Sequence, residues 1–112
     1  MNDLVKKAVQ LFNGKEKYNC AQAVLIAFKD LYEVDEKIIV EAGTWGHGRA
    51  DSGFCGAIEA AIYLSQKKMK AETVKVEFFK KVGSCYCKEI KKKKLQSCKT
   101  CVEIAAQILA DL

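Results

Sequence analysis

The stretch Asn-Cys-Ala-Gln-Ala-Val-Leu-Ile-Ala-Phe, residues 19–28, decides the fold class. Asn19, followed by Gln22 three positions later, is typical of a capping box, in which two side chains satisfy the free amides at a helix start. The apolar residues that follow cover more of the helix surface than the single apolar stripe of a helix that is buried on one side only. This stretch therefore predicts a central, mostly buried helix.

Apolar residues at helical spacing continue on both sides of this stretch, and alternation typical of strands is absent. Upstream, a helix is expected over residues 3–13, with Gly14 as its stop. The other expected helices are 35–42 with Asp35 as cap, 55–68, 71–82, one from Cys85 through the lysines, and a last one capped by Ser97. We expect an all-α, compact single-domain bundle of six or seven short helices with a glycine-rich loop over residues 43–56.

Length and composition exclude several classes of protein. The 112 residues suffice for one domain, residues 1–112, and 50% hydrophobic residues with 29% charged residues exclude a disordered chain. No apolar run approaches the roughly 18 residues that span a bilayer. The N-terminus lacks the pattern of a signal peptide. We therefore expect a cytoplasmic protein without a membrane segment.

Six cysteines and no proline are the main anomalies of composition. Without an export signal, six cysteines favour metal binding or thiol redox chemistry over a disulfide scaffold. The expected helix starts place Cys20, Cys55, Cys85, Cys87 and Cys98 in first turns, with Cys101 one turn after Cys98. The positive end of a helix dipole and nearby lysines lower a thiol pKa, so this placement predicts several thiolates near one another. The alternative is that these are small buried residues whose positions are incidental.

Cysteine spacing alone leaves three kinds of site open. Cys85, Cys87, Cys98 and Cys101 form a C-x-C-x10-C-x2-C pattern, which could hold a structural zinc ion, although it is not a standard finger spacing. Cys98 and Cys101 form a C-x-x-C, the likeliest local pair for a dithiol that cycles to a disulfide without a cofactor. An iron–sulfur centre is the third option, although the usual bacterial ferredoxin run is absent.

The order of the cysteine motifs resembles the C_GCAxxG_C_C family of redox-active proteins, which is named for four cysteines and a central C-G-A-x-x-G. The matching motifs are Asn19-Cys20-Ala21-Gln22, Cys55-Gly56-Ala57, Cys87-Lys88-Glu89-Ile90 and Cys98 ahead of Val102-Glu103-Ile104. Ala60 stands where the motif has its second glycine, and His47 stands where a glycine is expected.

The resemblance implies that Cys20, Cys55, Cys87 and Cys98 are the redox or metal-binding set and that Cys85 and Cys101 are additional. A related domain resembles the non-haem part of split-Soret cytochromes, which implies an iron–sulfur centre and a partner oxidoreductase with which electrons are exchanged. Zinc or no metal at all are the alternatives. No C-x-x-C-H is present, so covalent haem is not expected.

The glycine-rich loop is expected to line the site, because glycines let backbone amides approach sulfur and tune its potential. The residues concerned are Trp45, Gly46, His47, Gly48, Gly53 and Gly56. Trp45 would shield the site from water or serve only as a core anchor. His47, the only histidine, would be a metal ligand, an acid–base group or simply an exposed loop residue. The loop lacks the Gly-Lys-Ser/Thr of a phosphate loop, so no nucleotide is expected.

Charge is concentrated in the second half of the chain. Residues 1–62 carry 7 basic and 9 acidic groups, whereas residues 63–112 carry 12 lysines and 5 acidic groups. The run Lys91–Lys94 is interpreted as a solvated helix face or as positive charge that offsets thiolates. No nucleic acid is expected, since aromatic residues do not interleave with the lysines and Arg49 is the only arginine. No catalytic constellation is apparent, so catalytic residues are not assigned, and a homodimer is compatible with the sequence.

Overall fold

The computed structural model describes residues 2–12, 14–46 and 52–112, and within them the regular structure is helical. The α-helices are α1 (Asp3–Leu11), α2 (Cys20–Ala27), α3 (Lys29–Tyr32), α4 (Glu36–Glu41), α5 (Gly56–Ser65), α6 (Ala71–Val82), α7 (Cys87–Lys92) and α8 (Cys98–Ala110). Short 3-10 helices are η1 (Ala42–Thr44) and η3 (Gln66–Lys68). In these ranges the only extended pairings are two isolated bridges, Phe12 with Tyr18 and Phe54 with Tyr86. The all-α prediction is confirmed.

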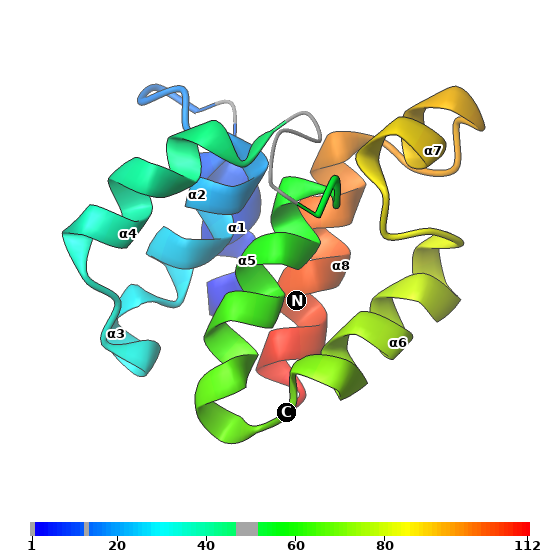
Figure 1. Cartoon of the computed structure of the whole chain (residues 1–112). Coiled ribbons are helices and arrows are strands. Elements are labelled where there is room, and N and C mark those ends of the chain that lie inside the picture. The colour runs from blue at the N-terminus through cyan, green and yellow to red at the C-terminus, as the bar shows by residue number, and fades with distance from the viewer. Residues whose placement is uncertain (1, 13, 47–51) are drawn as a thin grey trace.

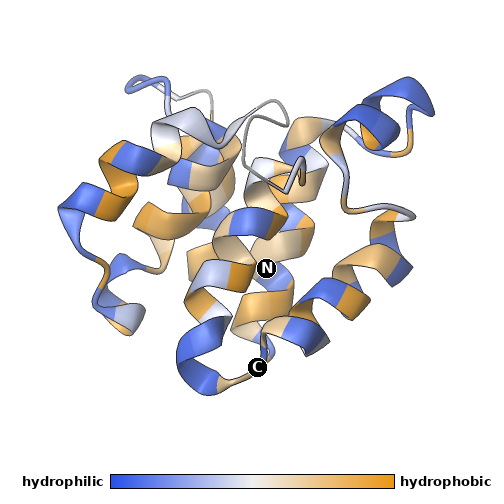
Figure 2. Ribbon diagram, in the orientation of Figure 1, coloured by the Kyte–Doolittle hydropathy of each residue, from blue (hydrophilic) through white to orange (hydrophobic). Residues whose placement is uncertain are grey.

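Two helices form the centre of the molecule. Six of the eight residues of α2 and seven of the ten residues of α5 are buried, which matches their continuous apolar sequences. Helix α5 packs against α2, α6 and α8, and α1 packs against both α2 and α8 (Figure 1). Figure 2 shows the hydrophobic residues gathered on α5 and α8 and the hydrophilic ones on the outer helices. One continuous core therefore holds every major helix.

The predicted capping box is present and does more than start a helix. Asn19 Oδ1 accepts a hydrogen bond from the Gln22 amide at 2.8 Å, and Gln22 Oε1 accepts one from the Asn19 amide at 3.1 Å. The two side-chain amides also donate to the carbonyls of Ala42 at 2.9 Å and Ile39 at 3.1 Å. The start of α2 is thereby tied to α4 and η1.

Several helix boundaries differ from those predicted. Helix α1 ends at Leu11, because the backbone of Phe12 is extended, and the helix expected over 55–68 is divided into α5 and η3. Helix α6 and the caps Asp35 and Ser97 are confirmed.

The prediction that a helix begins at Cys85 is wrong, because α7 begins at Cys87. Ser84 Oγ accepts a hydrogen bond from the Tyr86 amide at 3.1 Å, which closes a turn rather than capping a helix. Tyr86 itself is extended, and it forms the bridge to Phe54.

The arrangement of helices brings several of their starts to one end of the molecule. In Figure 1, α5 and α8 run side by side from the top of the view to the bottom, so both N-terminal ends lie at the top. Over the residues that the structure describes, no helix has the length and apolar character needed to cross a membrane.

Candidate functional site

A short antiparallel bridge fixes two cysteine-bearing segments against each other. The Cys55 amide donates to the Cys85 carbonyl at 2.7 Å, and the Cys87 amide donates to the Gly53 carbonyl at 3.1 Å. Between these bonds the rings of Phe54 and Tyr86 meet edge to face, with centroids 5.0 Å apart. The bridge therefore holds the start of α5 beside the start of α7, although 32 positions separate Cys55 from Cys87.

Four cysteines from four different helix starts line one pocket of about 460 Å³. Cys20, Cys87 and Cys98 are the first residues of α2, α7 and α8, and Cys55 occupies the N-cap position of α5. These are the four cysteines that the resemblance to the family singled out. Asn19, Gly46 and Gly56 also line the pocket.

The thiol of Cys55 lies near enough to those of Cys20 and Cys101 to perturb the pKa values of this group of buried thiols. Cys101 lies one turn into α8, is 1% exposed, and lines a small cavity of about 20 Å³ together with Cys55, Cys87 and Cys98. Because Cys101 lies one turn after Cys98, the sequence indicates that it is near the other cysteines of the site. The spacing of the cysteines does not predict its contact with Cys55.

Backbone amides at the start of α5 reach the same sulfurs. The Ala57 amide hydrogen-bonds the sulfurs of both Cys20 and Cys55, and the Ala21 amide hydrogen-bonds that of Cys20. These are among the free amides that the first turn of any helix provides. They stabilise negative charge on sulfur and would tune the potential of a redox group at this place.

The expectation of lowered thiol pKa values is wrong for four of the cysteines. The hydrogen bond to Cys55, together with burial, raises the pKa of Cys20 far above its usual range. The hydrogen bond to Cys101 and burial raise the pKa of Cys55 to about 12, against the opposing effect of Cys20. Burial raises the pKa values of Cys85 and Cys87, against the opposing effects of Lys75 and Lys91. Neighbouring thiols for Cys20 and Cys55, and burial for Cys85 and Cys87, outweigh the helix dipole, so these groups rest as neutral thiols.

Gly56 shows why the central motif needs a glycine after its cysteine. A Cβ atom at this position would lie 2.6 Å from the Cys20 sulfur, 3.2 Å from the Trp45 carbonyl oxygen and 3.3 Å from the Ala21 Cβ. The sulfur of Cys20 thus rests directly on the backbone of α5. Ala60, at the position of the second motif glycine, is fully buried within α5.

Cys85 lies apart from the other five cysteines. Its sulfur donates to the Lys75 carbonyl at 3.7 Å, and it lines a separate pocket of about 530 Å³ between α6 and the start of α7. Over the described ranges, no three His, Cys, Asp or Glu side chains converge closely enough to hold a single metal ion. The proposed zinc set of Cys85, Cys87, Cys98 and Cys101 does not share a pocket, because Cys85 lines the pocket beside α6 whereas the other three line a small cavity with Cys55.

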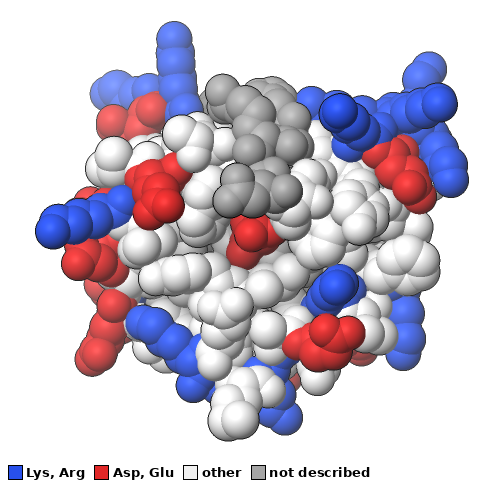
Figure 3. Space-filling model, in the orientation of Figure 1, with Lys and Arg blue, Asp and Glu red and all other residues white. Residues whose placement is uncertain are grey.

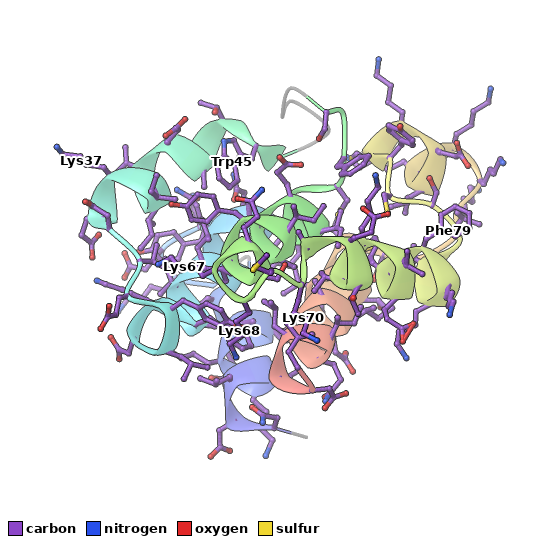
Figure 4. All side chains as sticks on the ribbon, turned by 60° about the horizontal axis from the view of Figure 1, so that its bottom comes forward. Lys37, Trp45, Lys67, Lys68, Lys70 and Phe79 are labelled. Atoms are coloured by element: carbon purple, nitrogen blue, oxygen red, sulfur yellow. The ribbon has the colours of Figure 1, made fainter. Side chains whose placement is uncertain are left out.

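The loop residues expected near the site play different parts. Gly46 lines the cysteine pocket, and a Cβ there would lie 3.2 Å from Asn19 Nδ2. Trp45 packs against Tyr63 in the core, with ring centroids 6.1 Å apart (Figure 4). Gly53 has a φ of +76° and serves the bridge. His47 and Gly48 lie outside the described residues.

Comparison with known proteins identifies a family for this chain. A family model described as "Putative redox-active protein (C_GCAxxG_C_C)" matches residues 18–112. The chain belongs to this family. No curated protein and no solved structure matches the chain.

Each part of the C_GCAxxG_C_C motif, as assigned in the sequence analysis, lies at the start of a helix in this fold. Its first cysteine begins α2, its C-G-A segment begins α5, and its last two cysteines begin α7 and α8. The motif glycine, Gly56, provides the space in which the sulfur of Cys20 approaches α5. With the motif assigned to Cys20, Cys55, Cys87 and Cys98 as the sequence analysis expects, its cysteines lie at helix starts around one pocket.

Proposed function

We propose that this C_GCAxxG_C_C protein is a small redox protein that holds an iron–sulfur centre through Cys20, Cys55, Cys87 and Cys98. The observation that supports the proposal is that these four thiols, from four separate helix starts, line one pocket of about 460 Å³. Four thiolates are the usual ligands of such centres. Cysteines that border one pocket from four sides could each bind an iron atom of a group of several atoms. The donor set therefore fits the group.

The chain's own residues would control the site in three ways. The bridge between residues 53–55 and 85–87 would fix the spacing of Cys55 and Cys87. The amides of Ala21 and Ala57 would hydrogen-bond the sulfurs of Cys20 and Cys55. The core around α2 and α5 would exclude water from the inner side. When bound, an iron–sulfur centre supplies reversible one-electron transfer.

The partner would be an oxidoreductase that exchanges electrons with the site, and the compartment would be the cytoplasm. All six cysteines are free thiols, as is usual where the surroundings are reducing. The exposed end of the site lies at Cys98, the one cysteine that is not buried. Lysines flank it on α7 and at Lys99, which favours an acidic partner surface.

Iron, acid-labile sulfide and the visible spectrum of protein purified without oxygen test the proposal. We expect iron with matching sulfide, and an absorbance that bleaches on reduction. Cys20→Ser should remove both, whereas the matched variant Cys85→Ser, in the separate pocket, should retain them. Wild-type protein without iron, or equal loss in the two variants, would overturn the assignment.

A cofactor-free thiol–disulfide protein is the second candidate, and the contacts of Cys55 with Cys20 and Cys101 favour it. Thiols in hydrogen-bond contact need little movement to form a disulfide. The C-x-x-C pair Cys98–Cys101 remains the local alternative. Metal-free wild-type protein whose thiol count changes by two on reduction would support this candidate over the first.

A further inference from the structure

We propose that the groove between α6 and the start of α7 binds a small ligand with a flat aromatic body and one anionic group. The groove has a volume of about 530 Å³ and shares no lining residue with the pocket of the motif cysteines. Sites for small ligands usually measure about 300–1,000 Å³ and combine apolar walls with a few polar groups. The proposal goes beyond the proposed function and does not depend on an iron–sulfur centre.

Aromatic side chains line this groove from two elements and remain open to solvent. Phe79, on α6, is 57% exposed (Figure 4), and Tyr86, just before α7, is 51% exposed. Phe54 also lines the groove, and its ring meets that of Tyr86 edge to face. Exposed rings gathered around one hollow favour a flat aromatic ligand, because ring contacts add to the gain from burying apolar surface.

Lys75 supplies the positive charge of the groove. It is half-buried, and its Nζ atom lies 5.5 Å from the centroid of the Phe54 ring. Among the residues that the structure describes, no carboxylate forms an ion pair with it. An unpaired ammonium group attracts an anion and repels a cation. Lys75 therefore favours a ligand whose anionic group meets Nζ while its aromatic body contacts the rings.

The other charged groups of the groove are paired or exposed. Lys80 and Glu89 each form an ion pair with a residue about one turn away, at 3.9 Å and 3.5 Å. Glu72 is exposed, so water and salt screen its charge. Residues 63–112, which include both helices beside the groove, carry 12 lysines and 5 acidic groups. The surroundings therefore favour an anion as well.

Contacts between its own walls hold the groove in shape. The Cys85 thiol donates to the Lys75 carbonyl at 3.7 Å, which ties the segment before α7 to α6. The Cys85 carbonyl accepts a hydrogen bond from the Cys55 amide at 2.7 Å. A site that is formed in advance loses little conformational freedom when a ligand binds. This gives Cys85 a structural role in the groove, apart from the other five cysteines.

The groove and the cysteine pocket share the bridge between residues 53–55 and 85–87 as a wall. Phe54 and Tyr86 line the groove, whereas their chain neighbours Cys55 and Cys87 line the pocket. A ligand in the groove would lie one residue away from two motif cysteines. It would not compete with a centre in the pocket, because the two sites have no lining residue in common.

Isothermal titration calorimetry on full-length protein, purified without oxygen and with whatever metal it holds, tests the proposal. The probes are naphthalene-2-sulfonate, the neutral 2-naphthalenemethanol and the cationic 2-naphthylmethylammonium, which share one flat ring system. We expect the sulfonate to bind at a single site, the alcohol to bind more weakly and the ammonium probe to bind most weakly.

Variants place the binding in the groove. Lys75→Gln should weaken sulfonate binding by about threefold or more and leave the affinity for the alcohol nearly unchanged. Lys81→Gln is the matched control, because Lys81 is an exposed lysine of α6 that does not line the groove. Phe79→Ala should weaken the binding of the sulfonate and of the alcohol by about threefold or more. Leu31→Ala, which shortens an exposed apolar side chain on α3, should change neither.

Three results would overturn the proposal. They are equal affinities for the three probes, equal losses in Lys75→Gln and Lys81→Gln, and no saturable binding of the sulfonate. All of these variants keep the six cysteines, so their iron and sulfide content should equal that of wild type. Ligand binding and the iron–sulfur assignment are thus read from different measurements, and either can fail without the other.

Discussion

At the scale of single residues, the site depends on how closely sulfur and backbone approach each other. Cys20 rests on Gly56, and one amide, that of Ala57, serves both Cys20 and Cys55. Such contacts leave no room for even one methyl group. The site therefore depends most on residues with a small side chain or, in the case of glycine, none.

Gly56→Ala is expected to destabilise the fold and displace the Cys20 sulfur. The added Cβ would lie 2.6 Å from that sulfur and 3.2 Å from the Trp45 carbonyl oxygen, and the latter cannot rotate away. Overpacking of this kind costs about 1–3 kcal/mol, which urea unfolding would measure. Gly43→Ala is the control, because its Cβ would meet only the side-chain end of Gln22, at 3.3 Å. Equal losses in the two variants would contradict this reading of the motif glycine.

Alkaline pH is expected to destabilise the reduced, metal-free protein through its raised thiol pKa values. Below the ordinary thiol pKa of 9.0, Cys55 is protonated in both the folded and the unfolded state. Between that value and its folded pKa of about 12, only the unfolded state releases the proton, so stability falls as the pH rises. The slope is up to about 1.4 kcal/mol per pH unit for each such group.

Guanidinium unfolding at a series of pH values would measure this slope. Cys55→Ala should be less stable at neutral pH but should lose less stability between about pH 8 and pH 10.5, since one titrating thiol is gone. Val102→Ala, a buried truncation in α8 without a titrating group, should keep the wild-type slope. A wild-type slope in both variants would mean that the Cys55 thiol is not held protonated by its surroundings.

At the scale of elements, the site is a set of helix starts held by few bonds. The capping box at Asn19 shows this most clearly, because its two side chains both begin α2 and hold the segment from Ile39 to Ala42. Asn19 therefore fixes the first residue of α2, Cys20, relative to the chain that leads into the glycine-rich loop.

Asn19→Ala should cost more than the loss of an ordinary cap. The cap itself is worth about 0.5–2 kcal/mol, and the further hydrogen bond to the Ala42 carbonyl contributes about 1 kcal/mol. Asn2→Ala is the matched control, because Asn2 caps α1 through one exposed bond, to the Leu4 amide at 2.8 Å. Urea unfolding of both variants tests the difference, and an equal change in stability would show that the tie to η1 contributes nothing.

Local signals in the sequence predicted most of these elements. The capping box, the apolar run of α2, the caps Asp35 and Ser97 and the bounds of α6 were all readable, because each depends on residues within a few positions. The start of α7 could not be predicted from local signals, because Ser84 is a residue type that commonly caps a helix and the sequence therefore places the helix start two residues too early. The pairing of Phe54 with Tyr86, which decides that Cys85 stays outside the helix, joins segments far apart in the chain.

At the scale of the whole molecule, the contacts among sulfurs were beyond the reach of the sequence for the same reason. Cys20, Cys55 and Cys101 come from α2, the start of α5 and α8, and only the packing of these helices brings them together. The resemblance to a family selected four cysteines but could not say that Cys101 contacts one of them. Contacts between thiols for Cys20 and Cys55, and burial for Cys85 and Cys87, reversed the expected direction of the pKa shifts, and a sequence states neither.

The excess of lysines in the second half of the sequence corresponds to a particular region of the fold. Figure 3 shows lysines gathered at the upper right, over α7, while the rest of this face carries both signs. Lys88 and Lys92 are exposed on α7, and the half-buried Cys98 follows shortly after this helix. Positive charge beside the exposed end of a redox site would steer an acidic electron-transfer partner toward it.

Charge reversal on α7 is therefore expected to slow electron exchange with an acidic partner. The double variant Lys88→Glu/Lys92→Glu should lower the second-order rate with reduced flavodoxin, an acidic probe, by about tenfold or more at low salt, and should weaken the salt dependence. The matched control Lys37→Glu/Lys70→Glu makes the same change in net charge at two exposed lysines, which Figure 4 shows away from α7. Stopped-flow absorbance of the proposed iron–sulfur centre would follow the reaction.

The two double variants distinguish an effect of the position of the α7 lysines from an effect of the net charge of the protein. If only the total charge of the protein mattered, both double variants would slow the reaction equally, and the lysines of α7 would have no special part. If the lysine face served nucleic acid instead, the α7 variant would lose salt-sensitive binding to duplex DNA while its rate with flavodoxin stayed the same. A rate that falls only when α7 is changed would place the docking surface beside Cys98, where the pocket of motif cysteines is most exposed.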